Sequence, residues 1–254
     1  MVRVFHVIRL RLWPLVIAIT VIVAFFRIYL SMKVVFNLLG GLRVLVILLW
    51  FKDVSRESDY LNEHRFLNNI FFKTGMILFI VSEVIFFVSF FWCYFDFVFV
   101  VDIELGGVWP PKGVRGINPF RVPLLNTMIL LSSGVTITWT HFSILFNDWF
   151  YAVITLGFTL GLGVYFLCIQ FQEYIDASFN FIRRGYGRIF FLATGFHGFH
   201  VFVGCWLISG GLIRLIIGVR DAYRHYNFEF AAWYWHFVDV VWLFLFIFIY
   251  WWGY

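Results

Sequence analysis

One carboxyl group, Glu83, lies in the middle of a long apolar stretch. It is the tenth residue of the segment 74–95, in which no other residue is charged. A charge at the centre of a lipid bilayer costs at least ~2.5 kcal/mol, so a carboxyl at that depth is expected to be protonated or paired. Glu83 is therefore a candidate proton-related residue. The alternative is a structural carboxyl that hydrogen-bonds to a neighbouring helix.

Two pairs of polar residues lie three positions apart inside other apolar stretches, namely His197 with His200 and His236 with Asp239. Residues at this spacing share one face of a helix. Such pairs could bind a metal or relay protons, but a buried metal site needs several convergent ligands with supporting partners. Hydrogen bonding between helices is the favoured interpretation. We expect these four residues and His141 to be buried polar groups.

The sequence offers no further set of residues with catalytic spacing. No two histidines within one apolar stretch are four helical turns apart, which argues against a dihaem four-helix cytochrome. A phosphate-binding loop, a dinucleotide fingerprint and a nucleophile elbow are also missing from the sequence. We therefore expect no catalytic residue, no metal and no haem in this chain.

A mixed-charge segment separates two of the apolar stretches. It contains Asp53, Arg56, Glu57, Glu63, His64 and Arg65. A solvated loop is one interpretation of such a segment. Near a membrane surface, arginine, histidine and carboxylate side chains could instead hold the phosphate and hydroxyl groups of a phospholipid. Both interpretations stay open at this point.

The composition indicates the class of protein in which these residues lie. Of the 254 residues, 63% are hydrophobic and 13% are charged, with a mean hydropathy of +0.90. An average soluble domain carries about 25% charged residues. The net charge of +5 comes from basic residues scattered between apolar stretches, which does not suggest nucleic-acid binding. Most of the chain is therefore expected to lie in lipid.

The apolar stretches predict an all-α polytopic membrane protein with seven transmembrane helices in a single membrane domain, residues 1–254. Five later stretches are long enough to cross a hydrocarbon core of about 30 Å. Two earlier ones are shorter or contain arginine, and we also predict that they cross. The expected helices cover roughly 12–32, 34–51, 74–97, 124–147, 149–170, 187–214 and 231–252.

Several motifs resemble one known family. They include GMILFIVSEVIFF at 75–87, ATGFHGFHVFVG at 193–204, AAWYWHFVDVVWLFL at 231–245 and YWWG at 250–253. In this order and spacing they resemble cytochrome c oxidase subunit III. The resemblance covers about residues 50–254, whereas residues 1–49 are similar in hydropathy only.

The resemblance implies an architecture and a set of partners. The family has seven helices, with the first two splayed from a five-helix bundle around a cleft that holds phospholipids. The implied protein is a multi-pass core subunit of the terminal respiratory oxidase, which reduces O2 to water and pumps protons across the mitochondrial inner membrane. It would pack directly on subunit I, alongside subunit II and accessory subunits. Haem and copper would reside in those partner subunits.

The resemblance also implies roles for single residues. Glu83 matches the family's carbodiimide-sensitive glutamate, which is associated with proton supply to subunit I and with sustained turnover. Arg56, Glu57, His64 and Arg214 match lipid-binding positions. The equivalent subunit of a bacterial quinol oxidase is an alternative. An ion transporter using Glu83 and Asp239 is disfavoured, because the sequence lacks an inverted repeat and interrupted helices.

Overall fold

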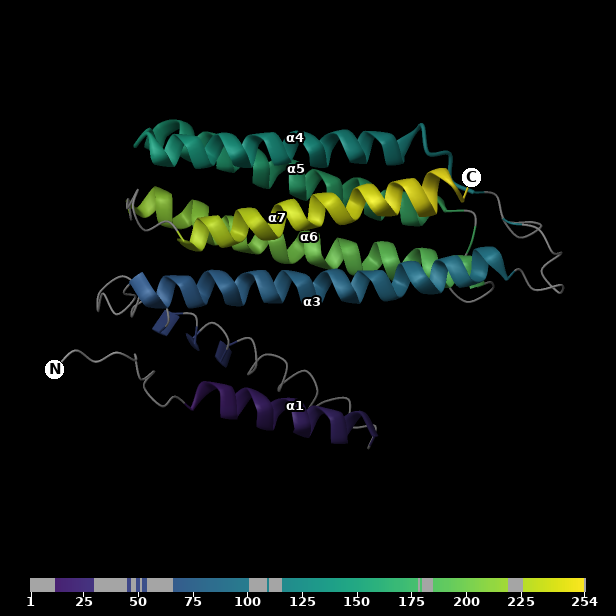
Figure 1. Ribbon diagram of the computed structural model, residues 1–254, viewed down its shortest axis with the longest axis horizontal. Helices are drawn as coiled ribbons and strands as arrows, with labels where there is room; N and C mark the ends of the chain where they lie inside the picture. Colours follow the sequence, from purple (N-terminus) through teal and green to yellow (C-terminus); the bar gives the residue numbers. More distant parts are fainter. Residues whose placement is uncertain are drawn as a thin grey trace. The chain divides into compact units, whose positions relative to one another are not determined.

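The computed structural model describes residues 12–29, 45–46, 49–50, 52–53, 66–100, 109, 116–177, 179, 185–218 and 226–253. Throughout these residues the regular structure is helical (Figure 1). The elements are α1 (Trp13–Tyr29), α3 (Phe66–Phe99), α4 (Val122–Leu145), α5 (Trp149–Asp176), α6 (Gly185–Ile217), α7 (Tyr226–Leu245) and a terminal π-helix η2 (Phe246–Trp251).

Five helical segments are long and apolar enough to cross a membrane. They are Ile70–Phe99, Val122–Leu145, Trp149–Asp176, Tyr186–Ile217 and Tyr226–Trp251. The count of seven crossings predicted from the sequence is therefore not confirmed. Over the first predicted crossing, 12–32, the structure shows α1 with 17 residues. Most of the second, 34–51, lies outside the described residues.

Two helices, α3 and α5, extend well beyond the limits predicted from hydropathy. The third predicted helix started at residue 74, but α3 starts at Phe66. The fifth was predicted to end at residue 170, but α5 continues to Asp176. Backbone hydrogen bonds continue through polar residues at the membrane surface, whereas a hydropathy count stops at the first charges. The polar residues near these ends are therefore helical.

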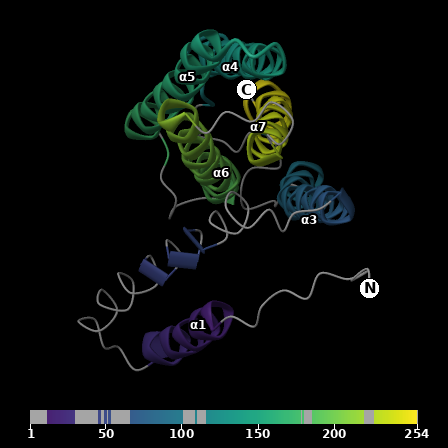
Figure 2. The ribbon, with the colours of Figure 1, turned by 90° about the vertical axis from the view of Figure 1, so that its left-hand side faces the viewer.

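Backbone contacts divide the chain into two units, Met1–Gly75 and Met76–Tyr254. In the first unit, the Trp13 indole donates a 2.9 Å hydrogen bond to Asp53 Oδ2. In the second unit, α4 packs on α5, α5 on α6, α6 on α7 and α7 on α4. Figure 2 shows these four helices end-on. They enclose the core of the second unit.

Hydroxyl pairs connect α4 to α5 inside this unit. Thr136 lies 2.8 Å from Thr159, and Thr140 lies 2.8 Å from Thr155, measured between the side-chain oxygens. Each of the four hydroxyls also lies within hydrogen-bonding distance of the backbone carbonyl three or four residues earlier in its own helix, which fixes the threonine side chain. In lipid, where hydrophobic association between helices is weak, such interhelical hydrogen bonds and close packing hold helices together. The α4–α5 contact is therefore well defined.

Trp235 occupies the junction of three helices. Its indole donates a 2.9 Å hydrogen bond to Ser133 Oγ on α4. A Cβ atom on Gly163 of α5 would lie 2.5 Å from this ring, and one on Gly204 of α6 would lie 2.8 Å from it. These two glycines leave the space that the Trp235 indole requires.

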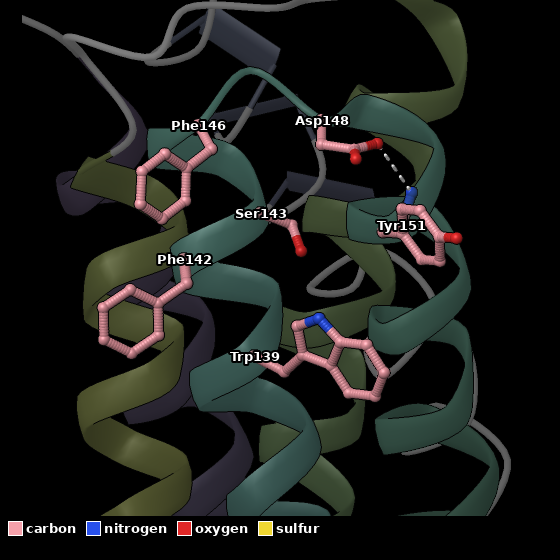
Figure 3. A pocket seen from close by; sticks show the side chains of 6 residues that line it. All are labelled: Trp139, Phe142, Ser143, Phe146, Asp148 and Tyr151. Atoms are coloured by element: carbon pink, nitrogen blue, oxygen red, sulfur yellow. Dashed lines mark hydrogen bonds between the residues drawn. The ribbon is translucent and has the colours of Figure 1, made fainter.

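The turn between α4 and α5 is short and polar. Asn147 adopts a φ of 59°, a left-handed conformation that asparagine tolerates at the end of a helix. The Asp148 carboxylate then accepts a hydrogen bond from the Tyr151 amide and caps α5. Beside this turn is a hollow of about 330 Å³, lined by Trp139, Phe142, Ser143, Phe146, Asp148 and Tyr151 (Figure 3).

The last turn of the α7–η2 segment is wider than an α-helix. The amide of Trp252 donates to the Ile247 carbonyl five residues earlier, at 3.0 Å. Tyr250 is buried within this turn, and its hydroxyl accepts a 3.2 Å hydrogen bond from the Gln170 amide of α5. The π-helix was not predicted from the sequence.

Candidate functional site

Glu83 forms a pair with a histidine of another helix. Its Oε2 atom on α3 lies 2.9 Å from Nε2 of His200 on α6. The two side chains are 23% and 8% exposed. Glu83 is far from both ends of its membrane-length segment, Ile70–Phe99. The sequence predicted that this carboxyl would be protonated or paired, and the structure shows a partner.

The second ring nitrogen of His200 determines how many protons the pair holds. Nδ1 lies 2.7 Å from the Phe196 carbonyl oxygen, which can only accept, so Nδ1 must carry a hydrogen. Nε2 then either accepts from a protonated Glu83 carboxyl or, in the imidazolium, donates to the carboxylate. Each arrangement places one proton between Oε2 and Nε2. Without that proton, a lone pair would face a carboxylate at 2.9 Å.

Aromatic rings surround this proton. The Tyr234 ring of α7 stacks on His200 with centroids 6.2 Å apart, and Phe87 meets the imidazole edge-on at 5.0 Å. Phe237 is a third neighbour at 6.2 Å. Tyr234, Phe87 and Phe237 are themselves buried. Apolar surroundings strengthen the hydrogen bond because they exclude competing water.

His197 does not contribute to this pair, although it lies only three residues from His200. It is fully buried, and its Nε2 donates a 3.2 Å hydrogen bond to the Val238 carbonyl of α7. Its ring contacts Phe166 and Trp242. The spacing predicted a shared helix face, and both rings contact α7, but His197 also packs on Phe166 of α5 whereas His200 pairs with Glu83 of α3. This agrees with interhelical hydrogen bonding rather than a joint site.

His236 and Asp239 lie next to each other on α7, but their contact is loose. His236 Nδ1 is 3.8 Å from Asp239 Oδ2, which is longer than a hydrogen bond. Asp239 is buried and its Oδ1 has no hydrogen-bond partner. The His236 side chain is 43% exposed, and His141 is also only partly buried. The prediction of burial was therefore too strong for these two histidines, because both lie toward the outside of the helix pair α4 and α7.

Of the four lipid-binding candidates, the described part of the chain contains Arg214. Arg214 lies in the last turn of α6. Arg56, Glu57 and His64 lie outside the described part of the chain. Their proposed contact with a headgroup remains a prediction. Arg214 has the position at a helix end that such a contact requires.

Sequence reasoning missed one buried polar cluster. Glu173 on α5 is 6% exposed and neither carboxylate oxygen has a hydrogen-bond partner. Nearby on the same helix, Gln170 accepts a 3.3 Å hydrogen bond from Asn126 of α4. Glu173 was overlooked because the predicted helix ended at residue 170. No cluster of three or more metal-ligating side chains occurs among the described residues.

Comparison with known proteins identifies the family. A family model described as cytochrome c oxidase subunit III matches residues 3–254. The chain belongs to the cytochrome c oxidase subunit III family. Relatives named cytochrome c oxidase subunit 3 occur in Drosophila melanogaster, at 47% identity over 98% of this chain and 97% of the relative, and in Aedes aegypti, at 46% over the same shares. A third, from Pisaster ochraceus, is 45% identical over 98% and 97%.

Membership of the cytochrome c oxidase subunit III family makes this chain a core subunit of the cytochrome c oxidase complex. The quinol-oxidase alternative is not favoured by these relatives. Five membrane-length helices and relatives from animals fit a multi-pass protein of the mitochondrial inner membrane. The Glu83–His200 pair therefore lies in the membrane domain of a respiratory-chain subunit.

Proposed function

We propose that this chain is a non-catalytic subunit that maintains the oxidase during turnover and holds an exchangeable proton at the Glu83–His200 pair. The observation that carries the proposal is the 2.9 Å contact between Glu83 and His200, with His200 Nδ1 bound to a carbonyl. A carboxyl and an imidazole that share one proton can pass it on with little movement of heavy atoms. Oxygen reduction itself would take place at haem and copper in partner subunits.

The proposal extends to the immediate neighbours of the chain. Subunit I is proposed as the direct partner, with subunit II and accessory subunits in the same complex. Seven crossings are proposed for the whole chain, with the first two formed by residues before α3. Bound phospholipid is proposed at the membrane surface, where Arg214 is the described candidate and Arg56, Glu57 and His64 are the candidates from sequence.

The proton role can be tested by changing Glu83 to glutamine in the assembled oxidase. Glutamine keeps the size and can hydrogen-bond to His200, but it cannot release a proton at physiological pH. We expect Glu83→Gln to assemble and to retain its initial rate of oxygen consumption, while activity declines faster over repeated turnovers. Asp96→Asn is the matched control, because Asp96 is a carboxyl near the carboxyl-terminal end of the same helix.

Two outcomes would overturn this proposal. Loss of oxygen reduction in fully assembled Glu83→Gln oxidase would place this subunit in the catalytic reaction. A variant identical to wild type in initial rate, turnover lifetime and proton uptake would leave Glu83 with a packing role only.

The cofactor and lipid proposals have independent tests. The separated subunit should show no Soret band and no stoichiometric copper, and a haem signal that resists washing would contradict the proposal. Arg214→Leu should lower the amount of phospholipid retained after detergent extraction. Unchanged phospholipid content would remove Arg214 from the lipid site.

A further inference from the structure

Polar side chains gather at one end of the helical core of the second unit. Glu173 lies three residues before the end of α5, Asn126 lies four residues after the start of α4, and Tyr250 is one residue before the end of η2. Together with Gln170 of α5 they form the Glu173 cluster, and all four side chains are buried. The Glu83–His200 pair is made by two other helices, α3 and α6.

The hydrogen bonds of the Glu173 cluster stop short of its carboxyl. Asn126 Nδ2 donates to Gln170 Oε1 at 3.3 Å, and Gln170 Nε2 donates to the Tyr250 hydroxyl at 3.2 Å. Asn126 Oδ1 and both Glu173 oxygens have no hydrogen-bond partner. The Tyr250 hydroxyl lies beside the Glu173 carboxyl, but its single hydrogen can satisfy only one carboxylate oxygen. The other carboxylate oxygen and Asn126 Oδ1 therefore need donors from elsewhere.

Protonation of Glu173 would not remove this requirement. A carboxylate only accepts hydrogen bonds, whereas a carboxylic acid has one hydrogen to donate and still has an oxygen that accepts. A buried polar group without a partner destabilises the fold in either state, and an ionised group does so more strongly. The cluster therefore needs a partner molecule whichever state Glu173 adopts.

Trp109 provides a complementary group. Its ring contacts Tyr94 of α3 at 5.7 Å and Tyr186 of α6 at 5.5 Å between centroids, and its buried Nε1 has no acceptor. Tyr186 lies near both Tyr94 and the Glu173 carboxyl. A donor without an acceptor and an acceptor without a donor thus border the same tyrosine.

The chemistry of these groups selects the class of ligand. The ligand must donate to oxygens of the Glu173 cluster and accept from the Trp109 indole. A metal cation cannot accept a hydrogen bond, and an anion would be repelled by the carboxylate. A water molecule donates and accepts, and buried waters typically make about three hydrogen bonds to polar groups that otherwise lack partners.

We infer that ordered water binds between Trp109 Nε1 and the Glu173 carboxyl and links Trp109 to the end of α5. Asn126 Oδ1 is a further acceptor for water in the same cluster. The inference goes beyond the proposed proton role, because neither Glu83 nor His200 takes part in this site. Its tests leave both of those residues unchanged, so a failure here is distinct from a failure of the proposed function.

A density map of the purified oxidase at a resolution that shows water tests the site directly. We expect a peak within about 3.2 Å of both Trp109 Nε1 and a Glu173 oxygen, which is the limit for a hydrogen bond. Absence of this peak would overturn the inference. So would a peak with oxygen neighbours at about 2.4 Å, which indicates a metal ion. A direct bond from the Trp109 indole to a protein acceptor, or a donor side chain of another subunit at Glu173, would also overturn it.

Replacement of Glu173 by methionine gives a test that depends on the sign of the effect. Methionine is similar in size and apolar, so removal of an unpaired carboxyl should leave stability unchanged or raise it. Removal of a carboxyl that binds water should instead abolish the density peak and leave the Trp109 indole unpaired. We then expect the temperature at which half of this subunit is lost from heated oxidase to fall by about 2–4 °C.

Two further variants control this measurement. Glu173→Gln keeps an acceptor, so it should retain the peak and most of the heat resistance. Gln172→Met changes the exposed residue just before Glu173 and should behave as wild type. Glu173→Met oxidase as heat-resistant as wild type would overturn the inference. The wild-type density map decides the question even if Glu173→Met does not assemble.

Discussion

Two histidine–carboxylate pairs in this chain have the same chemical groups and different surroundings. Glu83 and His200 belong to separate helices, lie 2.9 Å apart and are enclosed by aromatic rings. His236 and Asp239 belong to one helix and lie 3.8 Å apart, and the His236 side chain is 43% exposed while that of Asp239 is buried. The first pair completes its hydrogen bonds within the chain. The second pair does not, because Asp239 Oδ1 is buried without a hydrogen-bond partner.

The comparison shows that spacing along the sequence was a weaker guide than contact between helices. His236 and Asp239 were predicted to share a helix face, and they do, but His236 Nδ1 and Asp239 Oδ2 are 3.8 Å apart, too far for a hydrogen bond. Glu83 had no candidate partner in its own helix. Its partner comes from a segment 117 residues away in the sequence.

The largest effect is expected from Glu83→Lys. This change places a cation beside His200 in the membrane interior, where a charge costs at least ~2.5 kcal/mol. We expect the subunit to be lost from most assembled oxidase, as measured by quantitative mass spectrometry of the purified complex. Asp96→Lys is the control, because a lysine near the helix end can extend to the interface. If both variants assemble equally well, the conclusion that the surroundings of the Glu83–His200 pair exclude an added charge is wrong.

A smaller effect is expected from His200→Leu, which leaves the Glu83 carboxyl without its hydrogen-bond partner. Leaving a buried polar group unpaired costs about 1–3 kcal/mol. The isolated chain should therefore unfold at a lower temperature in detergent. His236→Leu should change the same midpoint little, because a 3.8 Å contact supplies no hydrogen bond within the chain. Equal losses for the two variants would contradict the distinction drawn between the pairs.

The smallest effect is expected from Gly134→Ala. The new methyl group must displace Asp239 Oδ2, which lies 2.9 Å from its position. Because the displaced atom is the end of a side chain rather than backbone, we expect a loss of about 1 kcal/mol, the lower end for overpacking. Gly157→Ala is the control, since a Cβ there meets nothing within 4 Å. Unfolding midpoints in detergent would show whether only the first variant is destabilised.

Much of the later fold could be predicted from sequence. The segments 74–97, 149–170 and 187–214 lie on observed helices, and 124–147 and 231–252 do so except for their last one or two residues, because long apolar stretches in lipid have few alternatives to helix. The helix ends could not be placed, since hydrogen bonding continues past the apolar residues. This error concealed Glu173, which the structure shows as a buried residue of α5.

The candidate site was predicted only in part. Glu83 was found because a lone carboxyl in an apolar stretch is conspicuous, but His200 could not be assigned to it. That pairing depends on how α3 and α6 approach each other, and no local pattern encodes this approach. Likewise, nothing in the motif around Gly134 indicated that it faces Asp239. Packing between helices decides which polar residues meet.

The π-helix η2 changes the directions in which the last side chains point around the helix axis. Counted from Leu245, an α-helix of 3.6 residues per turn would have rotated by about 500° at position 250, which is about 140° beyond a full turn. Tyr250 would then face away from the side on which Leu245 is buried. The wider turn of η2 delays this rotation, so that Tyr250 reaches Gln170 while Trp251 and Trp252 remain exposed. One irregular turn thus separates an inward-facing tyrosine from outward-facing tryptophans.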